Sequence, residues 1–93
     1  MNIEQFDDGK KGEFYIEIEG TQLAKMTYTY AGDDKIIIDH TEVNEKLKGQ
    51  GIGYKLVAAS VEFMRANNIK VIPLCPFAAA VFKKKQEYSD RLV

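Results

Sequence analysis

The sequence predicts a single α+β domain in which a mixed, mostly antiparallel sheet contains one β-α-β crossover and is followed by a C-terminal helix. Three observations predict this fold. Residues 13–30 alternate around a glycine turn, a glycine-rich loop joins residues 35–43 to a helical repeat, and an apolar segment returns at residues 69–75. A chain of 93 residues has room for one hydrophobic core. We therefore expect residues 1–93 to form one domain.

The first two predicted strands form a hairpin. Residues 13–19 alternate in part between apolar and polar side chains, and residues 21–30 do the same. Glu19 and Gly20 form the expected tight turn, because glycine adopts positive φ without steric cost. Residues 35–43 are predicted as a third strand, and the unbroken isoleucine run near its start predicts a central strand with both faces covered there.

A helix is predicted over about residues 51–66, where apolar side chains recur at helical spacing and form one stripe. Asn67 and Asn68 end this helix, since asparagine tolerates the left-handed conformation found just past a helix terminus. The crossover then places a strand at residues 69–75 parallel to residues 35–43.

Pro73 interrupts this last strand. Proline has no N–H to donate to a ladder, so we expect an edge, a bulge or a point at which neighbouring strands part. Pro76 suits the first turn of a second helix over about residues 76–87. The three lysines at residues 83–85 are interpreted as a solvated helix face rather than as a binding patch.

Composition and charge indicate which partners, cellular location and metal sites to expect. Thirteen basic and fourteen acidic residues leave a formal charge of −1, so we expect neither nucleic acid nor an anionic membrane as a partner. The first residues lack the features of a signal peptide, and no apolar run approaches the roughly 20 residues of a membrane span, which predicts a cytoplasmic protein. One cysteine, Cys75, and one histidine, His40, supply neither an internal disulfide nor a usual zinc site, so no metal is expected.

The loop at residues 48–53 reads Lys-Gly-Gln-Gly-Ile-Gly and lies between a predicted strand and a predicted helix. Glycines let backbone N–H groups approach a ligand, and the helix N-terminus adds unpaired donors and partial positive charge. Lys46 and Lys48 add full charges, so phosphate is the expected ligand. The loop is not a P-loop, because Tyr54 precedes Lys55 where a P-loop has glycine, and its G-x-G-x-G spacing is not the dinucleotide fingerprint.

The spacing that fits is the acyl-CoA signature of the GNAT superfamily of N-acetyltransferases, Q/R-x-x-G-x-G/A, which this loop resembles as Lys48-x-x-Gly51-x-Gly53. Lysine replaces the usual Gln or Arg, so the charge is kept while the hydrogen-bonding geometry differs. The order of predicted elements over residues 13–85 is also similar to that superfamily. Residues 39–43 and 73–76 look like its small, stand-alone branch.

The resemblance implies that the chain uses acetyl-CoA, with the pantetheine arm in an opening between splayed parallel strands at residues 39–43 and 70–75. Pro73 supports this opening independently, because parting strands tolerate a missing donor. A glycine-rich turn without a ligand is the alternative. The residues expected to bind the cofactor are Thr41, Glu42, Val43, Lys48, Gly49, Gln50, Gly51, Ile52, Gly53, Tyr54 and Phe77.

Acetyl transfer to an amine requires a deprotonated amine, a stabilised oxyanion and a proton for the leaving thiolate. His40 and Glu42 lie two apart on one strand and share a face, so either could take a proton; alternatively, the histidine only satisfies a hydrogen bond. Cys75 precedes a helix whose dipole favours a thiolate, so it could act as nucleophile or proton donor; alternatively, it is a small buried hydrophobe.

Many GNAT enzymes have a tyrosine on the last helix that protonates the leaving sulfur, and the matching residue here is Phe82, which has no proton to give. The resemblance also implies an open acceptor site, because the elements that usually shape it have no counterpart. The resemblance therefore implies an acetyl-CoA-dependent N-acetyltransferase that acts, as a monomer or homodimer, on a small-molecule or protein amine of unknown identity. A non-catalytic acyl-CoA-binding module and a protein-interaction domain are the alternatives.

Overall fold

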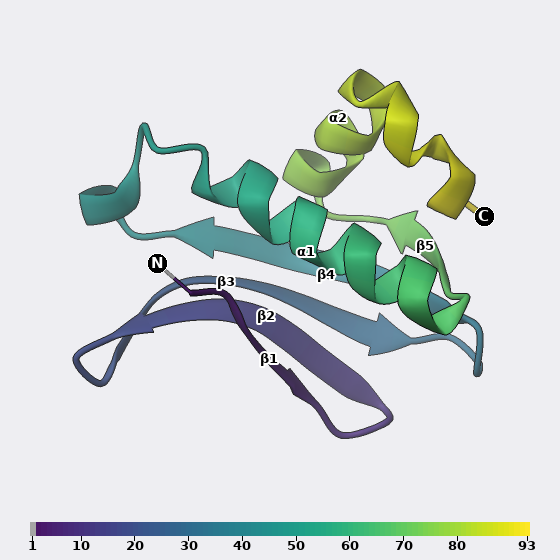
Figure 1. Cartoon of the computed structure of the whole chain (residues 1–93), viewed down its shortest axis with the longest axis horizontal. Helices are drawn as coiled ribbons and strands as arrows, with labels where there is room; N and C mark the ends of the chain where they lie inside the picture. Colours follow the sequence, from purple (N-terminus) through teal and green to yellow (C-terminus); the bar gives the residue numbers. More distant parts are fainter. Residues whose placement is uncertain (1) are drawn as a thin grey trace.

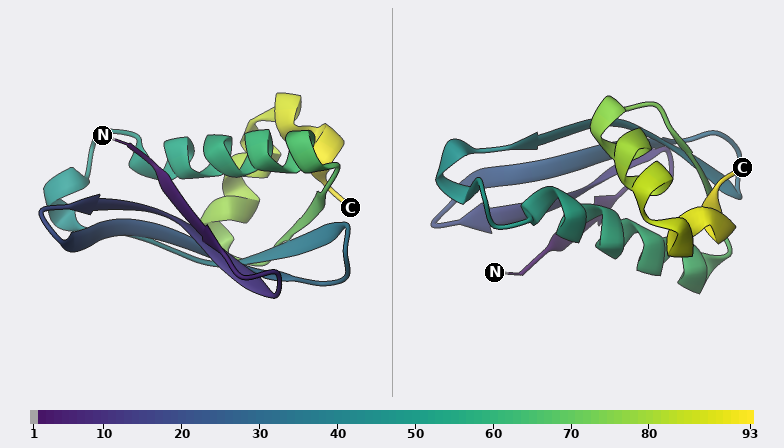
Figure 2. Two further views of the ribbon diagram at one scale, coloured as in Figure 1. Left: turned by 60° about the horizontal axis from the view of Figure 1, so that its bottom comes forward. Right: turned by 90° about the horizontal axis from the view of Figure 1, so that it is seen from above.

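The computed structural model describes residues 2–93, whose strands form one mixed sheet in the order β1-β2-β3-β4-β5 (Figure 1). The strands are β1 (Glu4–Asp7), β2 (Lys11–Ile18), β3 (Thr21–Tyr30), β4 (Lys35–Val43) and β5 (Lys70–Pro73). Strands β1 to β4 pair antiparallel, and β5 pairs parallel with β4. The helices α1 (Ile52–Asn67) and α2 (Pro76–Lys84) cover one face of this sheet (Figure 2). The predicted α+β fold with its crossover is confirmed.

The turn between β2 and β3 consists of Glu19 and Gly20, with φ of +50° and +79°. Two consecutive residues of positive φ match the right-handed twist of a hairpin, so the predicted turn is confirmed. Asn68 likewise ends α1 with a φ of +55° and donates its N–H to the Met64 carbonyl, as the sequence predicts.

Strand β4 is interior, between β3 and β5, as predicted. Ile36 and Ile38 are fully buried beneath the helices. Ile37 points to the other face and is only half-buried, so the prediction that both faces are covered is wrong. Within residues 2–93 both α-helices pack on the same side, which leaves the opposite face, hereafter the open face, exposed to solvent.

The two ends of the chain differ most from the prediction. Strand β1 was not predicted, and it extends the sheet at the edge of β2. The second helix ends at Lys84 rather than at residue 87 and is followed by the 3-10 helix η2 (Gln86–Arg91). Leu92 then forms a parallel bridge to Val71, so the C-terminal segment lies along β5. No helix within residues 2–93 has the length and apolar character needed to cross a membrane.

Strands β4 and β5 pair over four positions only and part after Ile38 opposite Pro73. The N–H groups of Leu74 and Cys75 both donate to the Ile38 carbonyl, at 3.0 Å each, which turns the chain from β5 into α2. Residues 39–43 continue along β3 without a parallel partner. The predicted parting of the strands at Pro73 is therefore confirmed.

A β-bulge in β4 decides which side chains face which way. Tyr28 lies opposite Ile38, whereas the preceding Thr27 lies opposite His40, so Asp39 is the extra residue. The Asp39 carboxylate accepts hydrogen bonds from the Thr27 and Thr29 hydroxyls. Beyond the bulge, the odd-numbered residues of β4 lie on the helix-covered face and the even-numbered ones on the open face.

Candidate functional site

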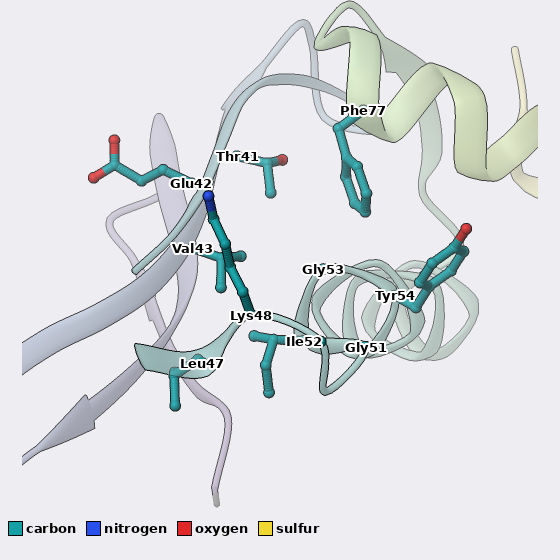
Figure 3. Close-up of a pocket in the computed structure, with 11 residues that line it drawn as sticks. Thr41, Glu42, Val43, Leu47, Lys48, Gly51, Ile52, Gly53, Tyr54 and Phe77 are labelled. Atoms are coloured by element: carbon teal, nitrogen blue, oxygen red, sulfur yellow. The ribbon is translucent and has the colours of Figure 1, made fainter. Parts of the chain in front are cut away.

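A pocket of about 350 Å³ lies between β4 and the N-terminal ends of α1 and α2 (Figure 3). This volume is within the range usual for small-ligand sites. Every predicted cofactor-binding residue except Gln50 lines this pocket, and Leu47 lines it without having been predicted. The lining residues are Thr41, Glu42, Val43, Leu47, Lys48, Gly49, Gly51, Ile52, Gly53, Tyr54 and Phe77.

The glycine loop forms the floor of the pocket next to the start of α1. Gly49 and Gly51 have φ of +81° and +68°, and a Cβ atom on either would meet no heavy atom within 4 Å. The first N–H of α1 with an intrahelical acceptor is that of Lys55, which donates to the Gly51 carbonyl at 3.1 Å. The N–H groups of residues 52–54 therefore lack an intrahelical partner and are free for an anion.

Gly53 allows the two helices to approach each other. A Cβ atom at this position would lie 2.4 Å from Cζ of Phe77, so the Phe77 ring occupies the space of the missing side chain. The same ring packs edge-on against Tyr54, with 5.9 Å between the ring centroids. Phe77 and Tyr54 thereby form the wall of the pocket on the side of α2 (Figure 3).

The short 3-10 helix η1 (Glu45–Leu47) positions Lys48, the lysine that lines the pocket. Asn44 begins η1 by accepting a hydrogen bond from the Lys46 N–H at 2.9 Å, and Leu47 anchors it in the core. Lys48 follows, and its side chain extends across the pocket toward β4 (Figure 3). Leu47 is the one apolar residue between charged neighbours, and that contrast is the sequence signal that could have identified it.

Cys75 lies behind the pocket, next to its lining residues Thr41 and Phe77. Its sulfur is 3.4 Å from Oγ1 of Thr41, and the residue is 6% exposed at the N-cap of α2. Burial raises the pKa of the thiol, but hydrogen bonding with Thr41 and with the N–H groups of Ala78 and Phe77 outweighs it and leaves the pKa below its ordinary value. The site therefore stabilises the thiolate more than water does for a free cysteine.

His40 and Glu42 lie side by side on the open face, with 2.9 Å between Nε2 and Oε2. The hydrogen bond from His40, assisted by the charge of Lys25, lowers the pKa of Glu42. The Glu42 side chain points away from the pocket (Figure 3), so its main chain is what borders the pocket. The predicted sharing of a face is confirmed, but this face is opposite to that of Thr41.

The profile of the family described as GCN5-related N-acetyl-transferase matches residues 13–91. The chain belongs to this family. A GCN5-like protein from Staphylococcus aureus is 40% identical, with a TM-score of 0.78 over 99% of this chain and 87% of that one. Protein NATD1 of Xenopus tropicalis is 27% identical over 91% of this chain and 81% of its own.

The GCN5-related fold also extends to more distant structures. A Clostridium acetobutylicum protein crystallised with acetyl-CoA has a TM-score of 0.63 at 18% identity, over 80% of this chain and 55% of that one. At this identity the likeness concerns the fold alone. The arrangement of sheet and helices is therefore shared with proteins whose sequences have diverged widely.

Phe82, where many GCN5-related enzymes have a tyrosine, is buried with 2% of its surface exposed. It packs edge-on against Tyr88, with 6.0 Å between ring centroids, and does not line the pocket. The groups that carry a transferable proton beside the parting of β4 and β5 include the Cys75 thiol and the Thr41 hydroxyl.

Proposed function

We propose that this protein binds acetyl-CoA in the pocket at the glycine loop and transfers its acetyl group to an amine. The observation that carries the proposal is the continuity of this pocket. It joins a loop with free backbone N–H groups, at residues 49–54, to the segment of β4 that has lost its parallel partner, at residues 41–43. A long ligand with an anionic end and a thin, amide-containing arm fits these two parts.

The donor set of the pocket suits the diphosphate of coenzyme A. The N–H groups of residues 52–54 and the ammonium of Lys48 would hold the negative charge. The open space above Gly49 and Gly51 leaves room for phosphate oxygens where any other residue would place a Cβ. Main-chain groups of residues 41–43 would pair with the amides of the pantetheine arm, in place of the missing strand.

Bound acetyl-CoA would supply an acetyl group activated as a thioester. His40 and Glu42 lie side by side on the open face. In this proposal the amine approaches the gap between β4 and β5 from that face, and these two groups remove its proton. Cys75 is proposed to act at the reacting end, as the nucleophile or as the proton donor.

A second candidate function is the binding of acyl-CoA without turnover. The observation that favours it is the buried phenyl ring of Phe82, which leaves the last helix without the proton donor found in many relatives. Both functions require the same ligand, so they differ only in whether the acetyl group leaves the pocket.

Two measurements test the proposal: a titration with CoA followed by NMR, and mass spectrometry of the protein after incubation with acetyl-CoA. Titration with CoA should shift the amide NMR signals of Gly49, Gly51 and Gly53 more than those of Gly9 and Gly20, which lie outside the pocket. Unchanged spectra at millimolar CoA would contradict the proposed function and would favour a protein-interaction domain.

Incubation with acetyl-CoA, followed by intact-protein mass spectrometry, then separates the roles of Cys75. An added acetyl group that is absent from Cys75→Ala supports the nucleophile. Thiol release with a panel of amines, without such an adduct, supports amine attack without a covalent relay. CoA binding without thiol release supports the binding module.

A further inference from the structure

Lys83 and Lys84 at the end of α2 are exposed to solvent, as predicted, but Lys84 and Lys85 also lie beside one aromatic ring. Nζ of Lys84 lies 5.7 Å and Nζ of Lys85 lies 5.8 Å from the centroid of the Tyr54 ring. Both distances are within the range of cation–π contacts. The Tyr54 ring is part of the pocket wall, so two ammonium groups gather at the rim of the pocket.

The geometry of α2 places these lysines beyond the Phe77 and Tyr54 wall of the pocket. Phe77 and Lys84 are seven residues apart on α2, hence on the same face and separated by about 10 Å along the axis. Lys85 is held at the C-cap by the bond from its N–H to the Val81 carbonyl, at 2.8 Å. Tyr54 bridges the distance, because its ring contacts Phe77 as well as both ammonium groups.

The charge gathered at this rim is not neutralised by the protein. The ion pairs within residues 2–93 join His40 to Glu42 and Asp90 to Arg65 and Arg91, and neither Lys84 nor Lys85 takes part in one. Two cations beside one ring repel each other unless an anion lies between them. A phosphate monoester, which carries close to two negative charges at neutral pH, is the complementary group.

We propose that Lys84 and Lys85, with the Tyr54 ring as a platform, bind the ribose 3′-phosphate of coenzyme A. This proposal rests on the proposed function, which assigns the diphosphate of the same ligand to the glycine loop. It adds a second anion site beyond the aromatic wall and identifies the residues that distinguish CoA from its 3′-dephospho form. The simpler account is that the lysines only complement the dipole at the C-terminal end of α2. That account predicts no dependence on the 3′-phosphate.

The test compares the affinities of CoA and 3′-dephospho-CoA by isothermal titration. For the wild-type protein we expect CoA to bind about tenfold more tightly, since contacts to exposed lysines are individually weak. In the Lys84→Ala/Lys85→Ala variant, both ligands should bind with equal affinity. Lys83→Ala is the matched control, because Lys83 lies in the same last turn and makes no cation–π contact with Tyr54, and it should keep the tenfold ratio.

Each outcome bears on one proposal. Equal binding of both ligands to the wild-type protein would overturn the 3′-phosphate site and leave acetyl-CoA binding intact. A ratio that survives in the double variant, or that Lys83→Ala lowers equally, would overturn it as well. If neither ligand binds, the proposed function fails and this inference fails with it.

Discussion

The Cys75 sulfur lies 3.4 Å from the Thr41 hydroxyl, across the point at which β4 and β5 part. Pro73 ends the ladder at this point, and Pro76 begins α2 three residues later. The same short segment therefore opens the sheet and places a thiol at a helix N-terminus. The opening of the sheet and the lowered pKa of the thiol therefore have one structural origin.

The first prediction concerns the pKa of Cys75. Replacing Thr41 by valine removes the hydroxyl that stabilises the thiolate, while the burial that disfavours it remains, so the pKa of Cys75 should rise. The measurement is the rate of alkylation by iodoacetamide against pH. In the wild-type protein the midpoint should fall below that of a cysteine in a short unstructured peptide measured in the same buffer.

Thr29→Val is the matched control for this measurement, because Thr29 lies on the open face and hydrogen-bonds Asp39 instead. Its alkylation profile should coincide with that of the wild-type protein. If the Thr41→Val profile did so too, Thr41 would have no part in activating the thiol.

The second prediction distinguishes two effects of alanine at Gly49: backbone strain, which lowers stability, and a clash with the ligand, which lowers CoA affinity. Gly49 and Gly20 have nearly equal φ, +81° and +79°, and a Cβ atom added at either would meet no heavy atom within 4 Å. Alanine at either position should lower the free energy of unfolding by about 1 kcal/mol, because positive φ is strained for it. Only Gly49→Ala should weaken CoA binding, since its methyl group would occupy the space assigned to phosphate.

Urea denaturation and CoA titration of both variants check this prediction. Gly20→Ala lies in the β2–β3 turn, away from the pocket, and serves as the control for strain. Equal CoA affinity in the two variants would show that the space above Gly49 is not used by the ligand.

Local patterns sufficed to predict the parts of the fold that local chemistry decides. Positive φ at Gly20 and Asn68, and the missing donor of Pro73, each act within a few residues of chain. Strand β1 was not predicted, because polar side chains face the helices and its apolar side chain faces solvent, the reverse of the usual pattern. Gln5 and Asp7 face the helix side and hydrogen-bond Tyr28, while the apolar Phe6 lies outside, 51% exposed.

The part of the candidate site formed by one continuous loop, residues 48–53, could be predicted from the sequence. The parts formed by segments distant in the sequence could not. Alternation alone would put His40 on the buried face with Ile38, because both are even-numbered in one strand. The bulge at Asp39 moves His40 to the open face, and the sequence carries no clear signal for it. The contact of Lys84 with Tyr54 also depends on how α2 packs against α1, which spacing within either helix does not reveal.

The third prediction concerns the pair on the open face. His40→Gln and Glu42→Gln should each lower the turnover of acetyl transfer at least tenfold, since a positioned general base contributes about 10²–10⁴ to the rate. Neither variant should change CoA affinity, because both side chains lie on the face opposite to the pocket. The measurement is thiol release at saturating acetyl-CoA, alongside CoA titration.

Glu13→Gln is the control for this pair, because Glu13 also lies on the open face, opposite Thr27, and is not paired with His40. It should keep full turnover. Wild-type turnover in both His40→Gln and Glu42→Gln would exclude the pair from the reaction and would leave the proton transfer to water or Cys75.

The last prediction concerns the pH dependence of stability and the attachment of β1. One oxygen of Asp7 accepts hydrogen bonds from the hydroxyls of Tyr28, at 2.6 Å, and Tyr30, at 2.7 Å. Burial raises the pKa of Asp7, but these hydrogen bonds outweigh it and lower the pKa below the usual value. Burial and the same carboxylate raise the pKa of Tyr30 to about 12 and that of Tyr28 further.

The directions of these pKa shifts predict that stability falls at both acid and alkaline pH. A lowered carboxyl pKa contributes stability above the pKa of the unfolded chain, about 3.9, which is lost as the pH falls through the folded value. A raised phenol pKa contributes stability below about pH 10, which is lost as the pH rises through the folded values.

Asp7→Asn should lower the free energy of unfolding by about 1 kcal/mol near neutral pH, given that Asp7 is exposed, and should make the loss of stability at both pH extremes less steep. Urea unfolding from pH 3 to 11 measures this, with the exposed Asp33→Asn as control, and an equally steep loss in Asp7→Asn would show that the cluster does not couple β1 to the core.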